Sequence, residues 1–113
     1  MIYTIDATEE TLGRLASRIA VILQGKTSAA YEPRLSGTDT VIVKNFSLVR
    51  VTGRKLRDKT YYRHTGYMGH LKKRTLGERL KRAPEEVLRY SVRHMLPKNR
   101  LAAKRLKRLI IEL

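Results

Sequence analysis

The segment TLGRLASRIAVILQ, residues 11 to 24, constrains the fold more than any other part of the sequence. As an α-helix it carries apolar side chains over more than half of its circumference, which suits packing against a sheet. Gly25 follows it as a typical helix stop, and the apolar run IYTIDA before it predicts a strand. These residues therefore predict a β-to-α unit.

The segments on either side extend this pattern. Thr8 is expected to cap the helix, with Glu9 and Glu10 placed against the helix dipole. Residues 26 to 39 contain Gly, Pro and Ser and predict a loop. TVIVK at 40 to 44 is typical of a buried strand, and LVRVT at 48 to 52 predicts another. Strands that alternate with helices favour a parallel sheet and an α/β sandwich.

The later residues predict three helices. Thr75 and Glu78 form a capping-box pattern for a short helix that ends near Arg82, and Pro84 opens a second helix that stops near Pro97. A last helix is expected at about residues 99 to 109. Two of these helices should show basic faces, which are formed by Arg89, Arg93, Arg100, Lys104, Lys107 and Arg108.

Charge is divided unequally along the chain, whose net charge is +15. Residues 1 to 49 carry five Lys or Arg and five Asp or Glu, whereas residues 50 to 113 carry twenty and five. A positive electrostatic field attracts polyanions and disfavours self-association of the chain. We expect one domain, residues 1–113, with a charge-balanced part at 1–49 and a basic part at 50–113 that faces a nucleic acid. We do not expect the chain to form a homo-oligomer.

Composition excludes several classes of protein. Cysteine is absent, which excludes thiolate metal sites and cysteine nucleophiles. No apolar run approaches the roughly 20 residues of a membrane-spanning helix, and MIYTIDATEE lacks the features of a signal peptide. We therefore expect a soluble intracellular protein with no membrane partner.

Enzyme and metal sites find little support in the motifs. GKTS at 25 to 28 lacks the earlier glycine of a phosphate-binding loop, because Ala20 stands there. Asp6 ends a predicted strand, where it more often serves as a turn acceptor than as a catalytic acid. His64, His70 and His94 match no metal-ligand spacing. We expect no cofactor, no metal and no small-molecule substrate.

The segment KTYYRHTGYMGHLKKRT, residues 59 to 75, has the chemistry of a nucleic-acid contact. Its cations can neutralise phosphates, its tyrosines can stack on bases, and Gly66 and Gly69 permit close approach of a backbone. One of Tyr61 and Tyr62 is expected to face the core. A DNA-binding or regulatory RNA-binding protein that acts alone, and a phosphate-handling α/β enzyme, are the alternatives.

Three motifs in order along the chain resemble the large-subunit ribosomal protein of the bacterial L-thirteen family: TLGRLAS at 11–17, VTGRKLRDKTYYRHTGY at 51–67 and MLPKNRLAAKRLKRL at 95–109. The resemblance implies a three-layer α/β/α domain with a small, mainly parallel sheet. It also implies contact with large-subunit ribosomal RNA and neighbouring ribosomal proteins, early entry into the subunit, and no catalytic activity. The expected location is the large ribosomal subunit of the cytoplasm or of an organelle.

The sequence departs from the family pattern at His70 and Ala102, where glycine is usual, and it is expected to lack the terminal extensions of its relatives. The residues predicted to bind RNA lie in the tyrosine-rich segment and the last helical region. They are Arg63, His64, Thr65, Tyr67, Lys72, Lys73, Arg74, Lys98, Arg100, Lys104 and Arg105, with Lys55 and Arg57 as second-tier candidates.

Overall fold

The computed structural model describes residues 1–69 and 71–113. Its elements in chain order are β1 (Ile2–Asp6), α1 (Leu12–Gln24), β2 (Thr40–Lys44), the 3-10 turn η1 (Phe46–Leu48), α2 (Lys55–Asp58), β3 (Thr60–His64), β4 (Leu71–Thr75), α3 (Leu76–Arg82), α4 (Pro84–Met95), α5 (Arg100–Leu106) and β5 (Leu109–Ile111). Strands β1, β2 and β5 form a parallel sheet in that spatial order, and β3 pairs with β4 antiparallel. The α/β class with a small, mainly parallel sheet and C-terminal helices is confirmed.

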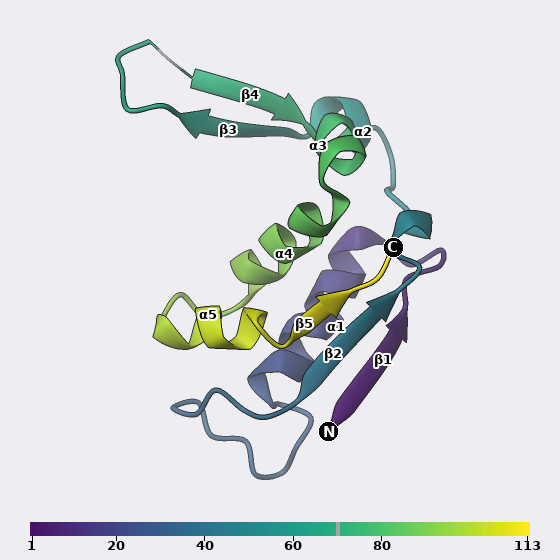
Figure 1. Ribbon diagram of the computed structural model, residues 1–113, viewed down its shortest axis with the longest axis vertical. Coiled ribbons are helices and arrows are strands. Elements are labelled where there is room, and N and C mark those ends of the chain that lie inside the picture. The colour runs from purple at the N-terminus through teal and green to yellow at the C-terminus, as the bar shows by residue number, and fades with distance from the viewer. Residues whose placement is uncertain (70) are drawn as a thin grey trace.

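The core lies between one face of the parallel sheet and the helices α1 and α4 (Figure 1). In β2, Val41 and Val43 are buried and lie in register with apolar residues of both neighbouring strands. Leu15 and Leu88 bring buried side chains to this core from α1 and α4. Alternate strand residues therefore face the helices, as a half-covered sheet requires.

The opposite face of the sheet is open. Ile2 is 68% exposed and Ile110 is 46% exposed, and Thr4 and Lys44 on the same face are also exposed. Of the three layers that the resemblance implied, the described residues form two, namely this sheet and the helical layer behind it (Figure 1). Helices α1 and α4 pack on the same face because their apolar stripes meet each other as well as the sheet.

The antiparallel pair β3–β4 projects from one end of the helical layer (Figure 1). We call it, with its connecting residues, the basic hairpin, residues 60 to 75. At its base, the Glu78 amide donates to Thr75 Oγ1 over 3.3 Å, and the Thr75 amide donates to Glu78 Oε2 over 3.4 Å. The predicted capping box is thus confirmed, and it fixes the point at which β4 turns into α3.

Thr8 does not cap the first helix, so the prediction of this cap was wrong. Its amide and its hydroxyl both donate to Asp6 Oδ1, over 2.9 and 2.6 Å, in a turn that follows β1. The N-cap residue is Thr11, whose side chain makes no capping hydrogen bond. The end of the helix agrees with the prediction, because Gly25 adopts the left-handed conformation with φ 83°.

LVRVT at 48 to 52 does not form the predicted strand. Its backbone makes a single parallel bridge, between Arg50 and Thr11. The ladder stops there because the partner segment turns into α1. Val49 and Val51 nevertheless pack against the core, which explains the apolar alternation of this stretch.

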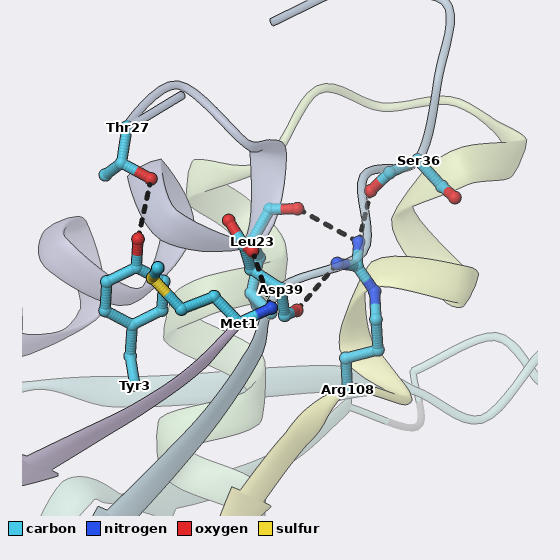
Figure 2. A network of polar contacts seen from close by, with 7 residues as sticks. All are labelled: Met1, Tyr3, Leu23, Thr27, Ser36, Asp39 and Arg108. Carbon is cyan, nitrogen blue, oxygen red and sulfur yellow. Dashed lines mark hydrogen bonds and ion pairs between the residues drawn. The ribbon is translucent and has the colours of Figure 1, made fainter. Parts of the chain in front are cut away.

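The last predicted helix is shorter than expected, because α5 ends at Leu106 and residues 109 to 111 form β5. Arg108, predicted to be exposed, turns inward and donates to the carbonyl oxygens of Leu23, Ser36 and Asp39 (Figure 2). The distance is 3.0 Å to Leu23 and 2.7 Å to Asp39. Burial, and next the neighbouring Arg105 charge, lower the pKa of Arg108. Arg108 thereby ties the loop at 26 to 39 to the start of β5.

No helix that the structure describes combines the length and the apolar character needed to cross a bilayer.

Candidate nucleic-acid interface

The basic hairpin exposes side chains on both of its faces. Direct cross-strand partners lie on the same face of an antiparallel pair. One face therefore carries Tyr61 opposite Arg74 and Arg63 opposite Lys72, and the other carries Tyr62 opposite Lys73. All four cations are exposed, so both faces present positive charge to the surroundings.

The pairing of Arg63 with Lys72 brings two like charges directly across from each other. Like charges in this position destabilise a strand pair. Residues 59 to 75 contain no carboxylate, and none of the hairpin cations forms an ion pair among the described residues. The hairpin thus holds a repulsion that its own residues do not relieve.

The face of the hairpin toward the protein body borders a cavity of about 390 Å³. The Tyr61 ring lies edge-on to the Tyr90 ring of α4, with centroids 5.2 Å apart and planes at 85°. The Arg79 guanidinium lies 4.5 Å from the first ring centroid and 5.3 Å from the second. Burial raises the pKa of Tyr61, and the Arg79 charge opposes that rise. This cluster anchors the hairpin to α3 and α4.

The prediction that one of the two adjacent tyrosines faces the core is confirmed. Tyr61 packs against the core cluster, whereas Tyr62 is 63% exposed. Lys73 Nζ lies 5.9 Å from the Tyr62 ring centroid, which is within the range of a cation–π contact. Tyr62 therefore offers its ring on the outer face beside a cation.

Residues 65 to 69 follow β3 and form the described part of the hairpin tip. Gly66 and Gly69 have φ values of 91° and 75°, a conformation that favours glycine. The Gly66 amide donates to His64 Nδ1 over 3.0 Å. The tip is exposed as far as it is described, and Met68 is 97% exposed. The prediction about His70 lies outside the described residues.

The structure places the other predicted residues in two groups. Lys55 and Arg57 are exposed on α2, close to the base of the hairpin. Lys98, Arg100 and Lys104 are exposed at the start of α5 and along it, at the far end of α4 from the hairpin (Figure 1). The structure therefore brings the hairpin residues together and leaves the α5 residues apart from them.

Arg105, predicted as an RNA contact, is only 1% exposed and belongs to the interior. It donates to the Leu35 carbonyl oxygen over 3.0 Å, beneath the loop at 26 to 39. Arg89, predicted on the basic face of α4, is half-buried and donates to the Leu106 carbonyl oxygen over 3.4 Å. Both arginines connect segments of the fold, because backbone carbonyls left without partners at these points need donors.

Sequence reasoning missed Arg79, which the structure places between two tyrosines. Arg79 is one of several Lys and Arg residues between positions 72 and 82, and no local sequence pattern distinguishes it from the others. Its role depends on Tyr61 and Tyr90, which come from different elements of the fold.

Asp6 lies in a hydrogen-bonded turn that follows β1. Asp6 Oδ1 accepts from Thr8 and, over 3.3 Å, from Asn45 Nδ2, and the Thr8 hydrogen bonds are the main cause that lowers the pKa of Asp6. Its prediction as a turn acceptor is confirmed. Within residues 1–69 and 71–113, no three His, Cys, Asp or Glu side chains gather so that they could hold a metal ion.

Comparison with known proteins gives a family for this chain. The family described as Ribosomal protein L13 matches residues 1–111. The chain belongs to the ribosomal protein L13 family. It is 53% identical over 107 residues to "Large ribosomal subunit protein uL13" of Aquifex aeolicus (strain VF5), which covers 95% of this chain and 74% of the relative. The protein of the same name from Pelobacter propionicus is 50% identical over 109 residues, 96% of this chain and 77% of the relative.

Family membership confirms the resemblance in the three sequence motifs. The L13 family consists of structural proteins of the ribosome, and the chain is not an enzyme. The phosphate-handling enzyme considered from the sequence is thereby excluded. About a quarter of the length of these relatives lies outside the match, so the residues of this chain itself must support any statement about contacts.

Proposed function

We propose that this chain is a structural component of the large ribosomal subunit that binds and stabilises large-subunit ribosomal RNA, and that it does so early in assembly. Its relatives carry the name of a large-subunit protein. The excess of positive charge in residues 50 to 113 supports RNA as the partner, since phosphates supply the missing negative charge. Neighbouring ribosomal proteins complete its surroundings.

The observation that carries this proposal is the unrelieved repulsion in the basic hairpin. A two-stranded hairpin exposed on both faces is marginally stable by itself, and Arg63 opposite Lys72 weakens it further. Phosphate oxygens placed between the two side chains would convert this repulsion into two attractions. The hairpin is thus built to be completed by a polyanion.

The two faces of the hairpin would make different contacts with RNA. Arg63, Lys72 and Arg74 on the inner face would hold RNA phosphates. On the outer face, Tyr62 and Lys73 would stack on a base and neutralise the adjacent phosphate. At the tip, exposed His64, Thr65 and Tyr67 would reach into a groove or loop of folded RNA.

Lys55 and Arg57 on α2 would support the hairpin contact, and a second contact is proposed for Lys98, Arg100 and Lys104. Their distance from the hairpin along α4 means that RNA elements far apart in sequence could meet on the same protein (Figure 1). Such bridging would stabilise the RNA fold, because the protein would make both contacts only when the two elements lie together.

Salt-dependent binding tests the RNA contact. The Lys73→Ala variant should reduce the slope of log affinity against log salt by about one, since one phosphate contact is lost. Lys26→Ala is the matched control, because Lys26 is an exposed cation of the charge-balanced part. Equal slopes for Lys73→Ala and wild type would contradict a phosphate contact there.

Sedimentation tests the place of the protein in the cell. The tagged full chain should sediment with large subunits, and it should be present in the early precursor particles of an assembly time course. A protein that stays at the top of the gradient would contradict membership of the subunit and favour a regulatory protein that acts alone. Absence from precursors, with presence in mature subunits, would contradict the early role alone.

A further inference from the structure

A second cavity, of about 680 Å³, lies between the start of α1 and the side of α4. Its floor is apolar and includes Leu12, Val51 and Leu76. The predicted RNA-binding residues lie elsewhere, apart from the second-tier candidate Lys55. We call this cavity the α1–α4 groove, and its other lining residues are Thr11, Gly13, Arg14, Ser17, Arg50, Thr52, Lys55, Lys59, Tyr90, Ser91, His94 and Met95.

The groove has the charge of an anion site. Arg14, Arg50, Lys55 and Lys59 line it, and no Asp or Glu is among its described lining residues. All four cations are exposed, and none forms an ion pair with any described residue. Four cations around one hollow repel one another unless an anion lies between them.

We propose that the α1–α4 groove binds the phosphodiester backbone of an RNA strand and forms one continuous binding track with the basic hairpin. This inference rests on the proposed function, because it takes RNA as the partner and adds a second place where the strand is held. The two sites differ in structural setting, because the hairpin projects from the protein body whereas the groove lies in the surface of the helical layer.

Continuity between the two sites is given by Tyr90, which lines both cavities. Its ring lies 4.3 Å from the His94 ring, centroid to centroid, on the groove side, and 5.2 Å from the Tyr61 ring on the hairpin side. Arg79 covers both tyrosines. A strand that leaves the inner face of the hairpin would therefore pass aromatic rings before it reaches the groove cations, an arrangement that suits bases and phosphates in alternation.

Gly13 gives the groove an open floor at the first turn of α1. Apart from its chain neighbours and the backbone of its own helix, no described heavy atom lies within 4 Å of the position that a Cβ on Gly13 would take. The space above Gly13 therefore belongs to the groove. The first turn of a helix also directs amides without helical partners outward, and Thr11 does not cap them with its side chain. A phosphate could approach here more closely than beside any other residue type.

The variant Gly13→Ala separates folding from binding. The added methyl group meets nothing in the free protein and favours the helix, so the Tm should rise by a few degrees. In the complex the same methyl group would occupy the space of the RNA backbone. Affinity for a transcript of the large-subunit ribosomal RNA should fall by about tenfold, the loss of one charge-assisted hydrogen bond.

Arginine variants test the charge of the groove. Arg14→Ala and Arg50→Ala should each reduce the salt slope of binding to the same transcript by about one, and Arg14→Lys should restore it. Lys26→Ala is again the control, because Lys26 is an exposed cation without an ion pair among the described residues and lies outside the groove. Its slope should equal that of wild type.

The outcomes distinguish this inference from the proposed function. If Lys73→Ala reduces the slope while Gly13→Ala, Arg14→Ala and Arg50→Ala bind as wild type does, the groove is not an RNA site and the proposed function stands. If none of these variants changes binding, both fail. The last experiment titrates the protein with inorganic phosphate and monitors the amide NMR resonances of Gly13 and Arg14. Saturation by phosphate without any loss of RNA affinity in Gly13→Ala would show an isolated anion site and overturn the proposal.

Discussion

The parallel sheet and the basic hairpin both contain five-residue strands but are stabilised differently. Strands β1, β2, β3 and β4 each have five residues. In β2, Val41 and Val43 are buried against helices, so the burial of apolar surface stabilises the strand pairing. In the hairpin strands, seven of the ten side chains are exposed, and four of the ten are Lys or Arg. The sheet is therefore specified by its own core, whereas the hairpin lacks such a core and, in the proposed function, is completed by RNA.

The largest effect should follow from damage to the core. Leu15→Ala removes a fully buried side chain between α1 and the sheet, and it should reduce the free energy of unfolding by about 2–5 kcal/mol. Urea denaturation measures this loss. The matched hairpin variant, Tyr62→Ala, should change the free energy by less than about 0.5 kcal/mol. A comparable loss in both variants would remove the distinction between the two regions.

The next effect concerns cations with different roles. Arg108→Met removes the donor to three backbone carbonyl groups and should cost about 2–3 kcal/mol. Lys107→Met, the same change at the exposed neighbouring residue, should stay within about 0.5 kcal/mol of wild type. Thermal unfolding of both variants checks the difference. Similar Tm values would mean that Arg108 does not hold the loop in place.

A charge reversal in the hairpin should have opposite effects on stability and on binding. Lys72→Glu replaces the repulsion with Arg63 by an attraction, which should stabilise the free hairpin by about 0.2–1 kcal/mol. Slower amide hydrogen exchange in β3 and β4 would report it. The salt slope of RNA binding should fall by about two, because one positive charge is removed and one negative charge is added.

Lys26→Glu is the matched control for this reversal, since it makes the same change of charge in the balanced part of the chain. It should leave hairpin exchange and the salt slope as in wild type. Tighter RNA binding by Lys72→Glu would overturn the view that the hairpin is completed by phosphates.

The smallest effect is a pH dependence at the end of β1. The pKa of Asp6 is lowered in the folded protein, so its stabilising contribution is present above the unfolded pKa of 3.8 and is lost as pH falls through the folded pKa. Asp6→Asn should therefore be less stable than wild type at neutral pH, and the difference should shrink as pH is lowered below that value. A constant difference between pH 7 and pH 3 would contradict this assignment.

Local patterns predicted the elements that local interactions determine. The apolar stripe of α1, the glycine that ends it, the run TVIVK and the capping box before α3 each involve residues close in sequence. The tyrosine-rich segment was also predicted to be a contact from its own composition. Its form as a hairpin, which pairs Arg63 with Lys72, follows from a register that composition does not set.

Features that depend on distant segments could not be predicted. Leu109 and Ile110 continue the helical spacing of α5, yet pairing with β2 makes them a strand. Arg105 and Arg108 resemble their exposed neighbours in sequence, and only the carbonyl groups of the loop at 26 to 39 distinguish them. The α1–α4 groove joins residues from four helices and one extended segment, so no single stretch of sequence indicates it.

The separation in sequence between paired strands has a consequence for the order of folding. β3 and β4 are close neighbours along the chain, so the hairpin closes only a short loop, an event that takes microseconds. The pairing of β2 with β5 instead joins distant parts of the chain, because α2, the hairpin and three further helices lie between the two strands in sequence. Contacts between such distant residues slow folding. The basic hairpin can thus close transiently before the core between the parallel sheet and the helices is complete.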